Sequence, residues 1–334
     1  MIAFIRKIFV SKWNQPVNII LVTAVLVLWI EASILIPLLL FTPSGTKVLT
    51  DIHPAPTPTP SPILTVQGTP PSLQSSAAYL LDADTNHVLV NINGQKRLPM
   101  ASTTKIMTAL VAIWKGKLDQ IVTVQQDAVD EATKNDGSSA QLVAGDQIRL
   151  GDLLYGLMLP SGDDAAIAIA DAISGSSTRF VTVMNEFAHQ LHLRHTHYGN
   201  CDGLTYKLPN GQIDPNNNYT TAADLAQLTH IALQSPVFDQ IIELQHYVLP
   251  TTATHHAYTW ETTNMLLSRY AGTTGVKTGY TMEAGYCLVF SAINTNHHLI
   301  GVLLHDSDDD PDQRFVDAQR LLDWGFHLPL RPPR

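Results

Sequence analysis

The chain has 334 residues, a formal net charge of -9 and 45% hydrophobic residues, which suits one good-sized globular domain with accessory sequence. The excess of acidic over basic residues argues against a nucleic-acid partner, and we expect none. Two cysteines far apart in the sequence, Cys201 and Cys287, do not define a disulfide, and we expect two unpaired thiols.

An apolar stretch dominates the N-terminal region. Residues 17–41 read VNIILVTAVLVLWIEASILIPLLLF, which is long enough to cross a hydrocarbon core of about 30 Å, for which roughly 20 residues are needed. Arg6, Lys7 and Lys12 precede it, so the positive-inside rule keeps residues 1–16 in the cytoplasm and places the following chain outside. A cleaved signal peptide is the alternative, but its apolar region usually has only about 7 to 15 residues. We therefore expect a single-pass membrane anchor with the globular part outside the cell membrane.

A segment rich in Pro, Thr and Ser follows the apolar stretch. Residues 42–76 include the alternating run PAPTPTPSP at positions 54–62. Such a composition cannot build a core and favours extended polyproline II, at about 3.1 Å per residue. We expect a linker over 42–76 and a globular domain over 77–331.

The globular part begins with alternating apolar and polar residues over 77–90, which predict a strand hairpin. A helix follows Ser102, with a predicted buried stripe at Met107, Leu110, Val111 and Trp114. Further helices are expected in 150–173, with a break at residues 160–162, and over 220–233 and 236–242. The C-terminal part predicts a strand at 275–290, a strand at 298–305 and a helix at 314–326. Strands at both ends predict an α+β fold, with an antiparallel sheet flanked by helices and a mostly helical subdomain.

A possible nucleophile lies at the start of the first predicted helix. Ser102 and Lys105 are three residues apart, and this helical spacing puts the hydroxyl and the amine on one face. A lysine that is neutral can take the proton of a serine and so activate it. Ser-x-x-Lys is common by chance, so the pair alone does not establish a catalytic site.

Two later segments complete a pattern. Ser161-Gly162-Asp163 stands at the predicted break between two helices, and Lys277-Thr278-Gly279 lies in a predicted strand. Ser-x-x-Lys, Ser-x-Asn and Lys-Thr-Gly in this order are typical of penicillin-binding proteins and serine β-lactamases. Over about residues 77–328 the chain resembles the D-alanyl-D-alanine carboxypeptidases of the serine peptidase type. Supporting segments are LMLPSGDDAA at 157–166, TTAADL at 220–225, GVKTGYT at 275–281 and LLDWGF at 321–326.

This resemblance implies a β-lactamase/transpeptidase-like fold and a reaction. Ser102 would attack the penultimate D-alanine carbonyl of a peptidoglycan stem pentapeptide, release the terminal D-alanine and then be freed by water. β-Lactams would acylate the same serine as covalent inhibitors. The resemblance implies no cofactor and no metal.

The resemblance also implies roles for individual residues. Lys105 would be the base for Ser102, and Ser161 would pass a proton to the leaving amine. Lys277 would tune the local field, and Thr278 would contact the terminal carboxylate.

Three further site residues follow from the same resemblance. Gly279 completes the strand motif, and the backbone N–H groups of Ser102 and Tyr280 would hold the oxyanion. Arg314 would bind the substrate carboxylate, because a guanidinium pairs with a carboxylate through two hydrogen bonds.

The sequence departs from the family pattern at Asp163, a predicted substrate-binding position where the family usually has asparagine. An ionised aspartate only accepts hydrogen bonds, whereas asparagine also donates them. A carboxylate beside Lys105 would also favour the charged form of that lysine and oppose its use as a base. We interpret this as a tuned site. Cys201 and Asp202 also stand where the family commonly has proline and histidine, and the sequence does not predict the effect of this change.

Two other functions compete with the carboxypeptidase. A β-lactamase shares the three motifs, but its commonest class uses a glutamate about 35 residues after the middle motif, and residues 194–200 (RHTHYGN) contain no acid. A membrane-tethered penicillin-binding or cell-wall-binding protein that is catalytically impaired at Asp163 is the other alternative. Transpeptidase and endopeptidase activities stay open because an amine can capture the acyl-enzyme. We expect His192, His195 and His197 to be surface residues rather than metal ligands.

Overall fold

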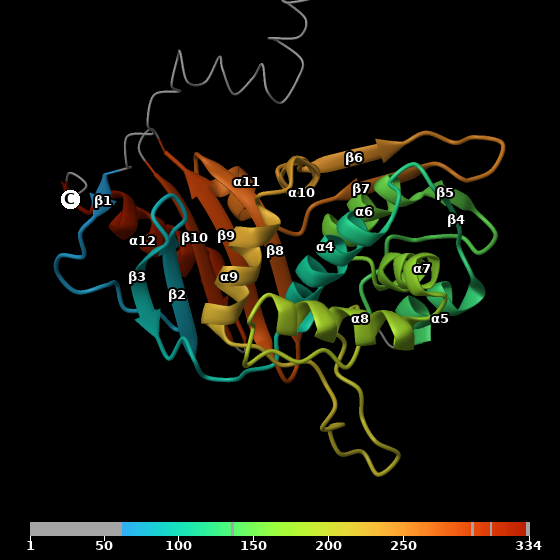
Figure 1. Ribbon diagram of the computed structural model, residues 1–334, viewed down its shortest axis with the longest axis horizontal. Coiled ribbons are helices and arrows are strands. Elements are labelled where there is room, and N and C mark those ends of the chain that lie inside the picture. Colours follow the sequence, from blue (N-terminus) through green and yellow to red (C-terminus); the bar gives the residue numbers. More distant parts are fainter. Residues whose placement is uncertain (1–61, 135–136, 295–296, 308, 332–334) are drawn as a thin grey trace, which may run out of the picture. The chain divides into compact units, whose positions relative to one another are not determined.

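Five antiparallel strands form the central sheet, in the order β3-β2-β10-β9-β8 (Figure 1). Their bounds are β2 Ala77–Asp82, β3 His87–Ile92, β8 Thr273–Thr281, β9 Gly285–Ile293 and β10 His298–Leu304. The computed structural model describes residues 62–134, 137–294, 297–307 and 309–331, all within one unit. The predicted anchor at 17–41 and the residues before it lie outside the described residues. No helix in the described part of the chain has the length and apolar character to span a membrane.

Helices cover both faces of the sheet. Since side chains alternate between the two faces of a strand, β2 contributes Ala77 to one core and Ala78 to the other. The first core also holds α4 (Lys105–Lys115), α9 (Ala222–Ala232) and α10 (Pro236–Ile242). The second core packs the sheet against α11 (Leu266–Arg269) and α12 (Gln313–Phe326), with Phe290 and Phe315 buried in it.

A helical subdomain lies beside the sheet, on the right in Figure 1. Its helices are α5 (Gln126–Lys134), α6 (Leu150–Met158), α7 (Asp163–Ser174) and α8 (Ser177–Gln190). Two short ribbons accompany them, β4 (Ile121–Thr123) with β5 (Gln147–Arg149) and β6 (His246–Leu249) with β7 (Tyr258–Glu261). Helix α4 connects the two parts, because its buried residues belong to the core shared by the sheet and the helices. The predicted α+β architecture with a mostly helical subdomain is confirmed.

Side-chain caps start helices α9 and α8. The Thr221 side chain accepts a hydrogen bond from Asp224 N at 3.1 Å, which satisfies one free amide of α9. Ser176 does the same for Arg179 N at the start of α8, at 3.3 Å. Residues 160–162 separate α6 from α7, as predicted.

The structure corrects three expectations. The single strand predicted over 275–290 is a hairpin of β8 and β9, and Gly285 provides the positive φ of 62° at the turn. Trp114 is 44% exposed instead of buried, because it lies near the end of α4 and covers Phe187 at the surface, with ring centroids 5.3 Å apart. The folded unit also starts before residue 77: β1 (Ile63–Leu64) pairs with β11 (Leu330–Arg331), and Leu64 is buried in the second core.

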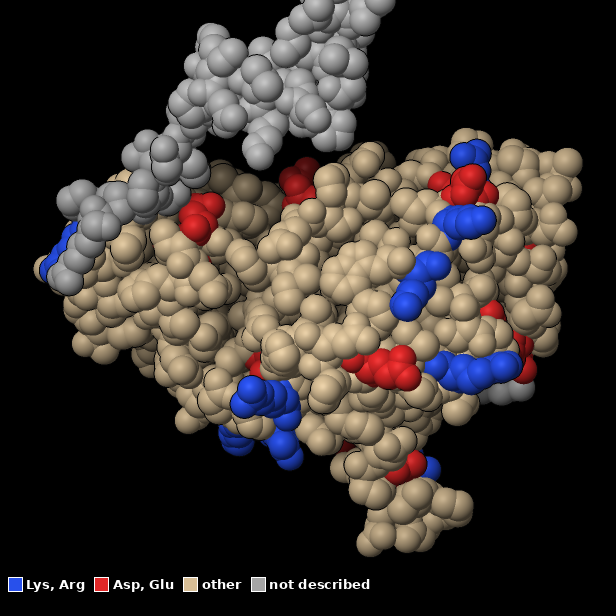
Figure 2. Space-filling model, in the orientation of Figure 1, with Lys and Arg blue, Asp and Glu red and all other residues tan. Residues whose placement is uncertain are grey.

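Charged side chains are sparse on the face shown in Figure 2. Basic and acidic groups are interspersed there, with wide uncharged areas between them.

Both cysteines are buried and unpaired, as predicted.

Candidate active site

Ser102 and Lys105 meet where a short 3-10 helix runs into α4. The 3-10 helix covers Ala101–Thr104, and Lys105 is the first residue of α4. Lys105 Nζ donates a hydrogen bond to Ser102 Oγ at 3.0 Å, so the predicted pair is formed. Ser102 is half-buried and open to a cavity, whereas Lys105 is fully buried.

Lys105 has two further partners. Its Nζ lies 2.5 Å from Asp163 Oδ1 and 2.6 Å from the backbone oxygen of Asp202. Asp163 is the first residue of α7, and its backbone N–H donates to Ser138 O at 2.8 Å. The lysine is therefore held by three acceptors that come from three different segments of the chain.

The loop that carries Asp202 packs against the nucleophile turn. Thr108 Oγ1 of α4 donates to Cys201 O at 2.6 Å, which fixes the loop beside Lys105. Gly203 has a φ of +98°, and a β-carbon there would lie 2.8 Å from Ser102 N. Only glycine fits this close approach of two backbones.

Ser161 projects from the break between α6 and α7. It has a φ of +68°, an uncommon conformation for a residue with a side chain, and such strain is frequent at functional sites. The residue is 4% exposed, and its hydroxyl has no hydrogen-bond partner in the described structure. A buried hydroxyl in this state is free to bind a group that enters the cavity.

Strand β8 closes the other side of the site. Thr278 Oγ1 lies 2.5 Å from Thr263 Oγ1, and Lys277 Nζ donates to Thr278 O at 3.0 Å. Gly279 lets the strand touch the nucleophile turn, because a β-carbon there would lie 3.1 Å from Ser102 N. Tyr280 is 49% exposed and stacks on Tyr286, with centroids 4.4 Å apart.

Arg314 reaches the site from the first turn of α12. Its Nη1 donates to Gly279 O at 3.1 Å and to Cys287 O at 3.3 Å. The guanidinium also lies 5.0 Å from the ring centroids of Tyr286 and Phe315. These contacts hold a positive charge at the end of the Lys-Thr-Gly segment.

These segments enclose a cavity of about 280 Å³. Its lining includes seven of the nine predicted site residues: Ser102, Ser161, Asp163, Thr278, Gly279, Tyr280 and Arg314. Lys105 and Lys277 are buried beside it, so the structure brings all nine together. The sequence did not predict Gly137, Ser138, Leu204 and Thr263, which complete the lining. All four lie in connecting segments; Leu204 belongs to the loop of Cys201 and Asp202, and the other three carry no recognisable motif.

Burial controls the charges in the site. Burial raises the pKa of Asp163, while the neighbouring Lys105 opposes that rise. Burial and the charge of Asp163 raise the pKa of Asp202 to about 7. Burial, followed by the charge of Lys105, holds the pKa of Lys277 well below its usual value. The site therefore holds acids and amines that resist full ionisation.

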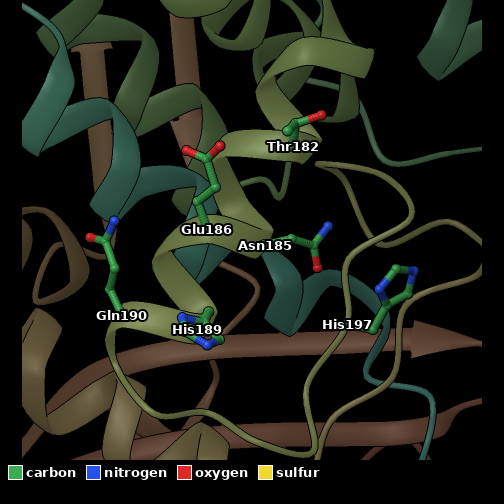
Figure 3. A pocket seen from close by; sticks show the side chains of 6 residues that line it. All are labelled: Thr182, Asn185, Glu186, His189, Gln190 and His197. Carbon is green, nitrogen blue, oxygen red and sulfur yellow. The ribbon is translucent and has the colours of Figure 1, made fainter.

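A separate hollow of about 600 Å³ lies along α8. Figure 3 shows its lining: Thr182, Asn185, Glu186, His189, Gln190 and His197. His197 Nε2 lies 2.9 Å from Asn216 Oδ1. The hollow contains none of the motif residues.

One group of side chains has the composition of a metal site. In the described ranges, Asp82, Asp84 and His297 are the residues whose ligand atoms all lie within 4.8 Å of one another. His297 Nδ1 is 3.3 Å from Asp82 Oδ2, so a histidine–aspartate pair joins the end of β2 to the residue just before β10. His192, His195 and His197 do not form such a group.

The fold and the Ser102–Lys105 pair define a serine enzyme of the acyl-transfer type. The family model of the D-alanyl-D-alanine carboxypeptidases, peptidase family S11, matches residues 65–308. The chain belongs to this family.

Individual relatives agree with the family match. The D-alanyl-D-alanine carboxypeptidase of Streptomyces sp. (strain K15) is 36% identical, with 78% of this chain and 90% of that protein covered. The carboxypeptidase DacF of Bacillus subtilis is 34% identical over 76% of this chain but only 62% of its own length. The chain thus spans less than two thirds of that relative.

Solved structures show the same fold. The crystal structure of the Streptomyces K15 DD-transpeptidase has a TM-score of 0.71 and 36% identity, with 78% of this chain and all of that chain covered. Penicillin-binding protein 6B from Escherichia coli has a TM-score of 0.69 and 30% identity, with 80% of this chain and 81% of that chain covered.

Proposed function

We propose that this chain is a serine D-Ala-D-Ala carboxypeptidase that removes the terminal D-alanine from peptidoglycan stem pentapeptides. The observation that carries the proposal is the Lys105 Nζ–Ser102 Oγ hydrogen bond of 3.0 Å at the edge of a cavity that the Lys-Thr-Gly strand lines. Family membership supports the substrate class. Acylation of Ser102 by penicillins follows from the same chemistry.

The site residues suggest a division of labour. Ser102 attacks the carbonyl carbon, and its proton leaves through Lys105. The backbone N–H of Ser102, with that of Tyr280, stabilises the oxyanion, since preorganised donors are worth about 10²-fold or more in acyl transfer. Ser161 delivers a proton to the leaving amine, because its buried hydroxyl lines the same cavity.

The remaining residues bind the substrate. Thr278 and Arg314 line the end of the cavity where the C-terminal carboxylate of the peptide would lie. Lys277 donates to the backbone oxygen of Thr278 and so holds this part of the strand, and Gly279 keeps the strand close to Ser102. Asp163 lines the cavity in the place of the usual asparagine.

The decisive experiment measures D-alanine release from a peptide that ends in Lys-D-Ala-D-Ala. Wild-type protein is expected to release D-alanine, and Ser102→Ala is expected to release none. A fluorescent penicillin should label the wild type covalently and turn over slowly. Folded protein that is labelled but releases no D-alanine would contradict the carboxypeptidase and favour a binding protein, and rapid nitrocefin hydrolysis would favour a β-lactamase.

Transpeptidation is a second candidate because the solved neighbour from Streptomyces K15 is named a DD-transpeptidase. An amine acceptor would then capture the acyl-enzyme in place of water. Adding glycine or D-amino acids to the release assay and analysing the products by mass spectrometry would detect the exchanged peptide.

We also propose that residues 17–41 anchor the protein in the cell membrane, with residues 1–16 inside and the catalytic domain outside. The apolar run and the basic residues before it support this arrangement. Membrane fractionation of the full chain and of a variant lacking residues 1–44 tests it. The full chain is expected in the membrane fraction and the truncated chain in the soluble fraction.

A further inference from the structure

Lys105 connects Ser102 to a carboxylate. Its Nζ lies 3.0 Å from Ser102 Oγ on one side and 2.5 Å from Asp163 Oδ1 on the other. The third contact, at 2.6 Å, is the backbone oxygen of Asp202. These three acceptors match the three N–H donors of an ammonium group, which has no lone pair to take a proton.

This geometry limits where the serine proton can go. Lys105 can accept the proton of Ser102 only if it gives up another one in the same event. Of its two other neighbours, the Asp202 carbonyl cannot keep a proton, whereas the Asp163 carboxylate can. An asparagine at position 163, as in the usual family motif, would also be unable to accept one.

We propose that Asp163 is the terminal proton acceptor of the acylation step and that Lys105 relays the proton to it. The Ser102 Oγ–H bond breaks as an Nζ–H bond forms, and a second Nζ–H bond breaks as an O–H bond forms on Asp163. Ser102 Oγ bonds to the carbonyl carbon. When the C–N bond breaks, the leaving nitrogen takes a proton from the Asp163–Lys105 pair, which restores the carboxylate; the Ser161 hydroxyl lines the same cavity and can pass a proton to that nitrogen.

The surroundings of Asp163 suit this role. Burial raises its pKa and so makes the carboxylate a stronger base than an exposed aspartate. Its position at the start of α7 favours the ionised form, which keeps the base available. The titratable groups that interact with its charge are Asp164, which is the next residue of α7, and Lys105, Lys277, Cys201 and Asp202 from other segments. Arg314 lines the same cavity.

This inference rests on the proposed acyl-enzyme mechanism and predicts a particular pH dependence. The experiment measures the second-order rate of acylation by a fluorescent penicillin from pH 5 to pH 10. In the wild type the rate should fall at low pH as Asp163 becomes protonated, and this fall forms the low-pH limb of the pH profile. In Asp163→Asn the carboxylate that accepts the proton is absent, so the serine proton has to pass to the solvent and the low-pH limb should move to higher pH. We expect a loss of about 10²-fold or more at pH 6, largely recovered at high pH.

Two controls separate the relay from a structural role. Asp163→Glu keeps a carboxylate and should retain more low-pH activity than Asp163→Asn. Asp202→Asn removes a neighbouring acid but keeps the backbone oxygen, so its low-pH limb should stay or move to lower pH. In mixtures of H₂O and D₂O, the wild-type rate should depend on deuterium content along a curve, because two protons move, whereas Asp163→Asn should give a straight line.

The outcomes are distinct. If Asp163→Asn is acylated as fast as the wild type at pH 6, or shows the same low-pH limb, the relay is wrong and the carboxypeptidase proposal stands. A straight-line deuterium dependence of the wild type would also overturn the relay, even if the variant fails to fold. If the folded wild type is not acylated at any pH, both proposals are wrong.

Discussion

The α-carbon of Gly203 packs against the peptide that joins Ala101 to Ser102, and a β-carbon there would lie 2.8 Å from Ser102 N. Gly203 also has a φ of +98°. Any larger residue must therefore move the turn that carries the nucleophile. The backbone of this loop is part of the site even though the side chain of residue 203 is only a hydrogen.

We predict that Gly203→Ala loses both stability and acylation. The positive φ costs about 1–3 kcal/mol for a residue with a side chain, and the overlap with the turn adds to it. Displacement of Ser102 by even about 1 Å can cost about 10²-fold in rate. Urea unfolding and the rate of penicillin labelling measure the two effects.

Gly211→Ala is the matched control for this prediction. Gly211 has a similar φ of +80°, but nothing lies within 4 Å of a β-carbon placed there. Gly211→Ala should lose only the stability that the positive φ costs, and it should keep the wild-type labelling rate. Equal labelling rates for the two variants would show that the contact between residue 203 and Ser102 has no catalytic importance.

A second prediction concerns the start of the folded unit. Leu64 is 1% exposed and packs in the second core, whereas its neighbour Ile63 is 37% exposed. We expect Leu64→Ala to lower the free energy of unfolding by about 2–5 kcal/mol and Ile63→Ala to change it much less. Urea denaturation measures both, and equal small effects would place this segment outside the cooperative unit.

The sequence predicted the residues that act in the site better than the walls around them. Ser102, Lys105, Ser161 and Lys277 lie in short motifs whose residue types and order carry chemical information. Thr263 contacts Thr278 only after the chain has folded, because the two come from separate segments. No local pattern marks such a residue. The third partner of Lys105, the backbone oxygen of Asp202, is likewise invisible in a sequence because every residue has one.

The fold was predictable where local and tertiary preferences agree. The sheet, the helix break at residues 160–162 and the helices 222–232 and 236–242 follow from periodicity, caps and proline. The β8–β9 hairpin was missed because the turn at residues 282–284 interrupts a continuous stretch of strand-forming residues without a strong turn motif. Trp114 was wrongly predicted to be buried, because helical periodicity does not show where the neighbouring elements stop covering the helix.

A third prediction follows from Asp306, which is buried two residues after the end of β10. Burial and the nearby charge of Asp317 raise the pKa of Asp306 to about 7. An unfolded aspartate has a pKa of about 3.9, so between these values the folded protein holds a proton that the unfolded chain has lost. The contribution of this group to stability is thus present below about pH 4 and lost as the pH rises through about 7.

Asp306→Asn should remove this loss of stability at higher pH, because the asparagine side chain does not ionise. The variant is expected to be about 1–3 kcal/mol more stable than the wild type at pH 8, with a much smaller difference at pH 4. Urea unfolding of both proteins at the two pH values measures the difference in their free energies of unfolding. The contributions of the other titrating groups cancel in this difference. A variant that is less stable at pH 8 would mean that the Asp306 carboxylate has a favourable partner when ionised.

The last prediction tests how the site recognises its substrate. Arg314 lines the cavity together with Thr278, and its guanidinium is held against Gly279 O and Cys287 O. A guanidinium can pair with a carboxylate through two hydrogen bonds, which the ammonium of a lysine cannot reproduce. Arg314→Lys should therefore lower kcat/KM for a peptide with a free C-terminal carboxylate by about 10-fold or more, since a bond to a charged group is worth about 1.5–3 kcal/mol.

A depsipeptide or thioester substrate whose C-terminal carboxylate is replaced by an amide should lose much less, because it lacks the group that Arg314 binds. Equal losses for both substrates would instead mean that Arg314 acts by holding β8 and β9 in place.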